Sequence, residues 1–159
     1  LATLKDLIPG ANNSPQFVRN TSEQFEARLV TVKILDSPSI LLKDMQGSCL
    51  PVPVAHGEGK ANFKSNNQQN ACLKNGLVSM QYVDNNHQPT SIYPLNPNGT
   101  KDGLTGFTTT DGRVTIMMPH PERSFMSRQL SWRPKDWPAN SSPWLRMFQN
   151  ARQWVENNR

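Results

Sequence analysis

The sequence is poor in cysteine and contains no long apolar run. Its 159 residues include two cysteines, Cys49 and Cys72, which stand in no C-x-x-C or other metal-ligand spacing. This argues against a disulfide framework and a structural zinc site, and it fits a reducing compartment. No apolar stretch approaches the length of a membrane span, and no charged-then-apolar leader opens the chain. We therefore expect a cytoplasmic protein without a membrane partner.

Clustered positive charge is also missing. Seventeen lysines and arginines against twelve aspartates and glutamates give a formal net charge of +5. Charge at this level suits nucleic acid or a phosphorylated small molecule. The basic residues are scattered, however, without a Lys/Arg run or interleaved aromatic residues. The sequence therefore predicts no nucleic-acid partner.

The length is enough for one ordinary domain with a real core, which we place at residues 1–159. The apolar fraction is only 35%, but four tryptophans and six phenylalanines supply large core residues. The opening "LATLKDLIPG" has no Met, and Leu4, Leu7 and Ile8 share a helical face before Pro9-Gly10 stops the helix. We therefore expect a piece of a longer chain.

Extended segments dominate the middle of the sequence. Alternating or apolar runs predict strands at 16–20, 25–35, 49–59, 76–84 and 91–100, the last running into a tight loop. Pro51 and Pro53 place the third of these at a sheet edge or in a strand-to-loop passage. Residues 104–118 form a hairpin around Asp111-Gly112, where glycine supplies a positive φ.

Three segments are expected to form helices or turns. Residues 37–47 predict a short helix or turn, and 63–76 a surface helix or loop. Residues 142–158 form an amphipathic helix, with Ser142 as cap and Pro143 in its first position. One face of this helix carries Trp144, Phe148, Ala151 and Val155. Strands between helices predict part of an α/β domain.

The stretch "MMPHPER", 117–123, places a histidine and a carboxylate two residues apart. Met118 and His120 each precede a proline, which disfavours helical geometry and predicts an extended backbone. In an extended chain, residues i and i+2 point to the same side, about 7 Å apart at their Cα atoms. Glu122 can then accept a hydrogen bond from His120, orient its ring and leave the other ring nitrogen free as a base.

A plainer reading of this stretch is a loop histidine beside a solvated Glu122 that pairs with Arg123. For an isolated H-x-E that reading is the more common one. The paired prolines and the strand that leads in bring the two readings level, because strand ends are where sites in open α/β sheets lie.

The stretch "PVAHGEG", 53–59, ends an apolar run with two glycines around a glutamate. Glycines let a backbone approach a ligand closely, and His56 could itself be catalytic. A simple turn is the alternative. No G-x-S-x-G accompanies this stretch, so a hydrolase oxyanion loop is not supported.

Five stretches together resemble one family. They are "RNTSEQFEAR", "PVAHGEG", "YPLNPNGT", "GRVTIMMPHPER" and "SPWLRMFQNAR". They are similar to the C-terminal class I, or triad, glutamine amidotransferase domain of the phosphoribosylformylglycinamidine synthases. The resemblance runs from Leu1 to about Arg152. "PHPER" and "AHGEG" also occur in separate glutaminase subunits, whereas "SWRPKDWPANSSPW" looks more like the long single-chain form.

The resemblance implies a fold and a chemistry. The fold would be the C-terminal part of a flavodoxin-like open sheet with added antiparallel hairpins and a C-terminal helix. A cysteine thiolate would attack the side-chain amide of glutamine, with His120 as general base and acid and Glu122 orienting it. Related amidotransferases imply that His56, Gly57 and Glu58 contact the glutamine. The segment "NTSEQFEAR" would either line the same pocket or face the synthetase.

The resemblance also implies partners outside the chain. Ammonia would pass to a synthetase domain of the same polypeptide, which uses ATP and Mg²⁺ to convert formylglycinamide ribonucleotide to formylglycinamidine ribonucleotide in purine synthesis. It implies no cofactor and no metal within this chain.

The sequence departs from the family at the nucleophile. The family motif G-V-C-N-G-C-Q directly precedes a segment like "LATLKDLIPG", and neither Cys49 nor Cys72 lies at a glycine-rich strand-to-helix elbow. We therefore expect that the sequence starts just after the nucleophile and is inactive alone. Two alternatives stay open, a stand-alone γ-glutamyl hydrolase and a non-catalytic interaction or regulatory domain.

Overall fold

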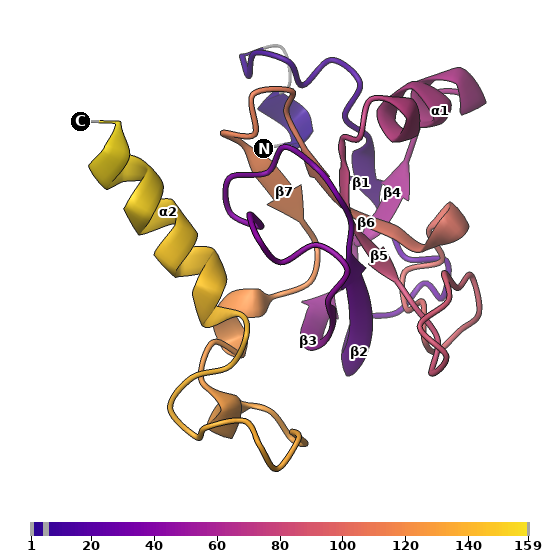
Figure 1. Ribbon diagram of the computed structural model, residues 1–159. Coiled ribbons are helices and arrows are strands. Elements are labelled where there is room, and N and C mark those ends of the chain that lie inside the picture. Colours follow the sequence, from indigo (N-terminus) through magenta and orange to yellow (C-terminus); the bar gives the residue numbers. More distant parts are fainter. Residues whose placement is uncertain (1, 5–6, 159) are drawn as a thin grey trace.

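A five-stranded sheet forms the centre of the computed structural model, which describes residues 2–4 and 7–158 (Figure 1). Its strand order is β3-β2-β5-β6-β7, and each of these neighbours pairs antiparallel. β1 and β4 form a separate antiparallel pair. The strands are β1 (Gln16–Val18), β2 (Glu26–Ile34), β3 (Cys49–His56), β4 (Lys60–Asn62), β5 (Val78–Tyr82), β6 (Leu104–Thr108) and β7 (Thr115–Met117).

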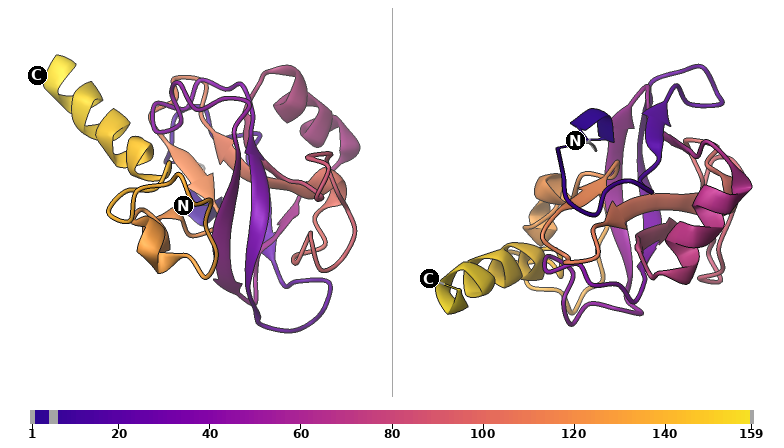
Figure 2. Two further views of the ribbon diagram at one scale, coloured as in Figure 1. Left: turned by 60° about the horizontal axis from the view of Figure 1, so that its bottom comes forward. Right: turned by 90° about the horizontal axis from the view of Figure 1, so that it is seen from above.

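Two α-helices lie at opposite ends of the molecule (Figures 1 and 2). They are α1 (Asn66–Lys74) and α2 (Leu145–Asn157), and short 3-10 turns occupy Ala2–Leu4, Lys101–Gly103, Pro121–Arg123 and Ser127–Gln129. The expected α/β class, antiparallel hairpins and C-terminal helix are confirmed. The strand pairings among the described residues are all antiparallel, so the flavodoxin-like parallel portion is not represented there. Within the same residues, no helix is both long and apolar enough to cross a membrane.

The proline-containing strand lies at the edge of the sheet, as the sequence predicts. β3 pairs with β2 along its whole length, with Pro51 opposite Thr31 and Pro53 opposite Leu29. The two strands run side by side in both views of Figure 2. Proline is tolerated in an edge strand because a backbone N–H on the outer side would have no partner strand, so its absence costs no hydrogen bond. The candidate catalytic histidine, His120, lies against this edge.

The hairpin at residues 104–118 is confirmed as β6 and β7. Gly112 has φ +70°, and a Cβ there would lie 1.9 Å from the carbonyl oxygen of Pro38. Ile40 donates its backbone N–H to the Gly112 carbonyl at 3.0 Å. Glycine is therefore required both by the turn and by close packing against the 38–40 segment.

The predicted strand at 91–100 is wrong, because this segment folds as consecutive turns. The buried side chain of Asn96 donates from Nδ2 to the carbonyls of Thr90 and Thr100, at 3.1 and 2.8 Å. Its backbone N–H donates to the Ile92 carbonyl at 2.9 Å. Asparagine competes in this way with strand hydrogen bonds, which the extended-looking pattern did not reveal.

The other local predictions are mostly confirmed. Residues 37–47 form turns and end at Gly47 with φ +82°. The predicted surface helix is α1, capped by Ser65, whose Oγ accepts from the Gln68 N–H at 3.2 Å. At the N-terminus, Ala2–Leu4 form a 3-10 turn, and Lys5 and Asp6 lie outside the described residues. The predicted helix does not continue through residues 7–10, which form turns, and Leu4 and Leu7 are 47% and 79% exposed.

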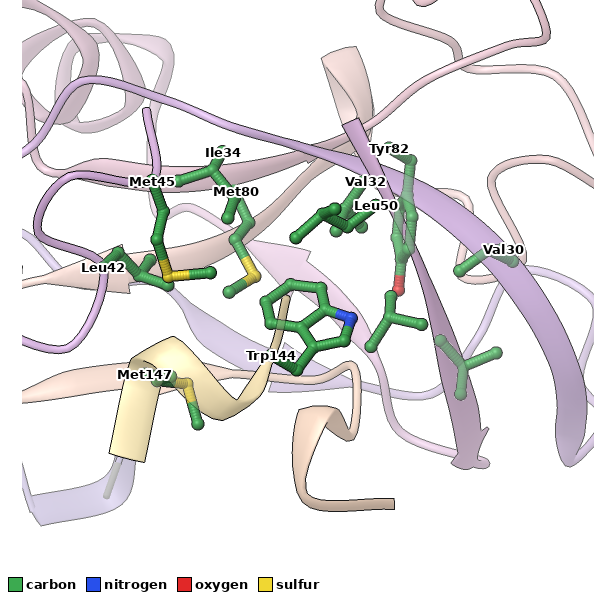
Figure 3. Close-up of a cluster of buried hydrophobic side chains, with 12 residues drawn as sticks. Val30, Val32, Ile34, Leu42, Met45, Leu50, Met80, Tyr82, Trp144 and Met147 are labelled. Carbon is green, nitrogen blue, oxygen red and sulfur yellow. The ribbon is translucent and has the colours of Figure 1, made fainter. Parts of the chain in front are cut away.

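The main core lies where β2, β3 and β5 meet the start of α2. Figure 3 shows the indole of Trp144 in the middle of this cluster. Trp144 is fully buried, and its Nε1 donates to the Pro51 carbonyl at 2.8 Å. The cluster consists of Val30, Val32, Ile34, Leu42, Met45, Leu50, Val52, Val54, Met80, Tyr82, Trp144 and Met147. A single aromatic residue thus ties the C-terminal helix to the edge strand.

Helix α2 begins slightly later than predicted and buries a different face. Ser142 Oγ accepts from the Trp144 N–H at 3.2 Å, and α2 starts at Leu145. Phe148 and Val155, expected on the buried face, are 41% and 44% exposed.

The buried face of α2 is made by Met147 and Asn150 instead. Asn150 Nδ2 donates to the carbonyls of Leu41 and Lys43, at 3.0 and 2.7 Å. These tertiary hydrogen bonds, rather than the apolar stripe alone, set the rotation of the helix.

Candidate active site

His120 and Glu122 form a hydrogen-bonded pair at the edge of the sheet. His120 Nδ1 lies 2.7 Å from Glu122 Oε1. The His120 N–H donates to the Pro53 carbonyl at 2.8 Å, which fixes the histidine beside β3. Since a carboxylate can only accept, Nδ1 carries the hydrogen and Nε2 is left as the basic nitrogen. The structure therefore has the hydrogen bond that the sequence predicts.

The backbone that brings the pair together is not the predicted one. His120 has φ −111° and ψ 75°, and Pro121–Arg123 then form a 3-10 turn instead of continuing extended. Proline fits the first position of such a turn because it needs no N–H partner there. The alternative ion pair is present as well, but it is longer: Arg123 Nε lies 3.8 Å from Glu122 Oε1 between two exposed side chains. A contact of that kind contributes little.

His56 lies beside His120, at the end of β3. The two ring centroids are 5.9 Å apart, with the planes inclined by 36°. His56 is 8% exposed, so burial lowers the pKa of its imidazole, and the neighbouring His120 acts in the same direction. The structure therefore brings together His56 and His120, which belong to two separate motifs of the sequence.

The other residues predicted to contact glutamine follow His56 in the same loop. The Gly57 carbonyl accepts from the Asn20 N–H at 2.8 Å, and a Cβ on Gly57 would meet nothing within 4 Å. Glu58 is exposed. Glutamine binding by these residues stays a prediction. At Gly59, in contrast, a side chain could not be accommodated, since a Cβ there would lie 2.3 Å from His56 Nε2.

Sequence reasoning missed two buried asparagines in this region. Asn20 and Asn98 are 2% and 0% exposed, and both hydrogen-bond to the His56 loop. They belong to the "RNTSEQFEAR" and "YPLNPNGT" stretches, which carry the family resemblance but do not by themselves single out these two residues. The 21–24 and 91–99 loops also border a cleft of about 470 Å³. Whether the "NTSEQFEAR" segment lines a substrate pocket or faces a partner domain stays open.

Neither cysteine belongs to this site. Cys49 lies at the opposite end of β3, four residues from Pro53 and so about 13 Å further along the strand. Cys72 lies in α1, where burial raises the pKa of its thiol to about 11. Its neighbours form the second core cluster, Ala61, Leu77, Val78, Leu104 and Phe107. Both cysteines are therefore structural residues, as expected from the sequence.

Thiol labelling checks this assignment. We expect iodoacetamide near neutral pH to alkylate Cys49 at an ordinary thiol rate and to leave Cys72 unmodified, because a buried thiol of high pKa holds almost no thiolate. Peptide mass spectrometry before and after denaturation gives both rates, and the denatured protein serves as the control in which the two cysteines react alike. Rapid modification of either cysteine in the folded protein would contradict this placement.

Over 2–4 and 7–158, no group of three or more His, Cys, Asp or Glu side chains is arranged to hold an ion. The arrangement at His120 can instead accept and return a proton: one ring nitrogen is oriented by a carboxylate, and the ring is 27% exposed.

Comparison with known proteins bears on the fold and on the family of the chain. Among solved structures, the chain is similar to one described as "Structure of PurLQS from Thermotoga maritima", with a TM-score of 0.62 and 18% sequence identity. The match covers 89% of this chain and 53% of that chain, so this chain spans about half the length of the solved one. At this identity the likeness shows a shared fold.

The family comparison covers almost the whole sequence. Residues 1–155 match the family described as "CobB/CobQ-like glutamine amidotransferase domain". That range includes the His56 loop, the two buried asparagines and the His120–Glu122 pair. The chain belongs to the CobB/CobQ-like glutamine amidotransferase domain family.

Proposed function

We propose that this chain is the acid–base part of a glutaminase that releases ammonia from the side-chain amide of glutamine. The observation that carries the proposal is the 2.7 Å hydrogen bond between His120 Nδ1 and Glu122 Oε1 at the edge of the sheet. It leaves Nε2 of a partly exposed imidazole free to move a proton. Membership in a glutamine amidotransferase family supports glutamine as the substrate.

The chemistry follows from the orientation of the ring. His120 Nε2 would take the proton of a cysteine thiol, and the thiolate would attack the amide carbon of glutamine. As the tetrahedral intermediate collapses, His120 would return the proton to the departing nitrogen, which leaves as ammonia. Water would then attack the thioester with the same histidine as base. The carbon–sulfur bond would break, glutamate would leave, and His120 would return the proton to the cysteine sulfur. Glu122 would stabilise the imidazolium at each stage.

The nucleophile would come from outside the 159 residues. Cys72 is buried in α1 and Cys49 lies toward the far end of β3, so neither can reach His120. A cysteine at a strand-to-helix elbow of the same polypeptide would complete the triad, as the family resemblance implies. The non-catalytic alternative applies if that position holds another residue.

The ammonia acceptor is proposed from the five stretches that resemble phosphoribosylformylglycinamidine synthase. A synthetase domain of the same cytoplasmic polypeptide would bind ATP and Mg²⁺ and would use the ammonia to convert formylglycinamide ribonucleotide to formylglycinamidine ribonucleotide. The present chain would contribute the glutaminase half and no cofactor site.

Isotope transfer tests this function. Full-length protein is incubated with amide-labelled glutamine, formylglycinamide ribonucleotide, ATP and Mg²⁺, and the product is analysed by mass spectrometry. We expect the amide label in the formylglycinamidine product, with labelled ammonium ion as a positive control for the synthetase step. Glutamine hydrolysis without label in any product would favour the stand-alone hydrolase. Absence of hydrolysis beside working ammonia-dependent synthesis would favour the non-catalytic domain.

A further inference from the structure

Three buried polar side chains form a connected network against His56. They are Asn20, Asn98 and Tyr82, none of them more than 2% exposed. They come from the segment before β2, from the 91–100 turns and from β5, and they meet at the end of β3. In a buried network of this kind, each group must act as donor or acceptor according to its neighbour, so the side chains adopt one specific arrangement.

The orientation of Asn20 is fixed by backbone groups. Its Nδ2 donates to the carbonyls of His56 and Gln24, at 2.8 and 3.0 Å. Its Oδ1 accepts from the Gly59 N–H at 2.9 Å. A backbone carbonyl can only accept and a backbone N–H can only donate, so the amide of Asn20 has one possible orientation.

Two neighbouring side chains fix the orientation of the Asn98 side-chain amide. Asn20 Oδ1 requires a donor, and it receives Asn98 Nδ2 at 2.8 Å. On the other side, the Tyr82 hydroxyl donates to Asn98 Oδ1 at 2.5 Å. Burial raises the pKa of the Tyr82 phenol, which therefore keeps its hydrogen. Both contacts place Asn98 Nδ2, a donor, toward the imidazole of His56.

This arrangement determines where the His56 ring carries its hydrogen. Asn98 Nδ2 lies 2.9 Å from His56 Nε2, so Nε2 must accept. The ring is then neutral, with its hydrogen on Nδ1. Nδ1 is buried toward the backbone of Met118 and makes no hydrogen bond among the residues that the structure describes.

Burial and the neighbouring His120 lower the pKa of His56 and so favour the same neutral state, while the Glu26 carboxylate acts in the opposite direction. The buried Glu26 is its cross-strand partner, but that carboxylate is paired with Arg28 and accepts from Ser22 Oγ at 2.5 Å. On the other side lies His120, whose own partner is Glu122. A proton on His56 would face the Asn98 donor and would also oppose the imidazolium that His120 forms during proton transfer.

We propose that Asn98 is a positioning residue for the glutaminase reaction: its side-chain amide holds His56 as the neutral Nδ1–H tautomer beside the ring of His120, so that no second positive charge opposes the imidazolium that His120 forms. This inference rests on the proposed function. Gly59 fits the same role, because its Cα lies over the His56–Asn98 hydrogen bond and a Cβ would come within 2.3 Å of both side chains. Glycine at position 59 therefore leaves the space that this hydrogen bond occupies, and a side chain there would displace it.

The state of His56 can be read by NMR in labelled native protein, with its ring assigned as the signal lost in His56→Gln. We expect a protonated Nδ1 and an unprotonated Nε2 at neutral pH. In Asn98→Ala the donor is gone, and the ring is expected to shift toward the Nε2–H tautomer. A native ring with its hydrogen on Nε2, or an unchanged tautomer in Asn98→Ala, overturns the proposal. The native measurement decides even where the variant does not fold.

Asn150→Ala is the matched control for the activity test. Asn150 is also a buried asparagine, but it lies in α2 and donates to the carbonyls of Leu41 and Lys43, not to His56. In the full-length protein, we expect Asn98→Ala to lower the glutamine-dependent kcat by about tenfold to a hundredfold, the effect of a misplaced catalytic group, with KM little changed. Asn150→Ala should leave kcat and the His56 tautomer unchanged.

The outcomes separate this inference from the proposed function. Equal losses of kcat in the two alanine variants would make Asn98 an ordinary structural residue. If native protein has the expected His56 tautomer but never hydrolyses glutamine, the proposed function fails, and the positioning role fails with it, whereas the hydrogen-bond network remains established. The opposite tautomer in an active glutaminase overturns only the role assigned to Asn98.

Discussion

Replacing His120 by asparagine is expected to abolish glutamine-dependent synthesis while ammonia-dependent synthesis continues. His120 is the residue proposed to take the thiol proton and to return it to the leaving nitrogen, and Asn can do neither. Loss of the base from a catalytic triad lowers kcat by about four to six orders of magnitude. Added ammonium ion bypasses this step, so the synthetase reaction should keep its rate. Steady-state assays of the full-length protein with each nitrogen source measure both activities.

His87→Asn provides the matched control. His87 lies in the exposed turn after β5, with φ +61°, a conformation that asparagine tolerates well. Its backbone N–H bonds to the Asp84 carbonyl and survives the substitution. We expect both activities to be unchanged in this variant. If His120→Asn removes glutamine- and ammonia-dependent synthesis together, His120 has a structural role and the catalytic assignment is wrong.

Replacing Trp144 by alanine is expected to cause a large loss of stability. Trp144 is fully buried at the junction of α2, β3 and β5 (Figure 3), and its Nε1 hydrogen bond to Pro51 would also be lost. Removing a buried Trp lowers the free energy of unfolding by about 3–5 kcal/mol. For a chain of this size, such a loss lowers Tm by about 10 °C. Chemical and thermal unfolding measure both quantities.

Trp132→Ala tests whether the effect comes from burial. Trp132 is 66% exposed in the loop before α2, so the same substitution should change stability by at most about 0.5 kcal/mol. Equal destabilisation by the two substitutions would contradict the assignment of Trp144 to the core. Because Pro51 is two residues before Pro53, which holds His120, we also expect Trp144→Ala to weaken glutamine-dependent activity at temperatures where the protein is still folded.

The sequence predicted local features where one short pattern has one stable outcome. Pro51 and Pro53 remove backbone donors, which predicted a sheet edge or a strand-to-loop passage, and β3 lies at the edge. Gly112 in an Asp-Gly pair between two extended runs could only turn the chain. The His120–Glu122 hydrogen bond was likewise predicted from a spacing of two residues, although a 3-10 turn rather than an extended backbone brings the side chains together.

The tertiary structure decided the features that depend on distant partners. The stretch at 91–100 was predicted to begin as a strand, but the Asn96 side chain bonds to its own neighbouring backbone and holds the segment as turns. Helix α2 turns Phe148 toward solvent, because Asn150 is held by the 41–43 segment more than one hundred residues earlier. The periodicity of apolar residues predicts which face of a helix is buried, but it does not reveal polar side chains that bond to distant segments.

The same division applies to the candidate site. His56 and His120 were each recognisable from their own motifs. The state of the His56 ring, however, depends on Asn20, Asn98 and Tyr82, which lie 36, 42 and 26 residues away in the chain. Spacing along one strand or turn determines which neighbouring side chains can meet. Only the folded chain determines which buried donors and acceptors face each other, because each hydrogen-bond role is set by a partner from another element.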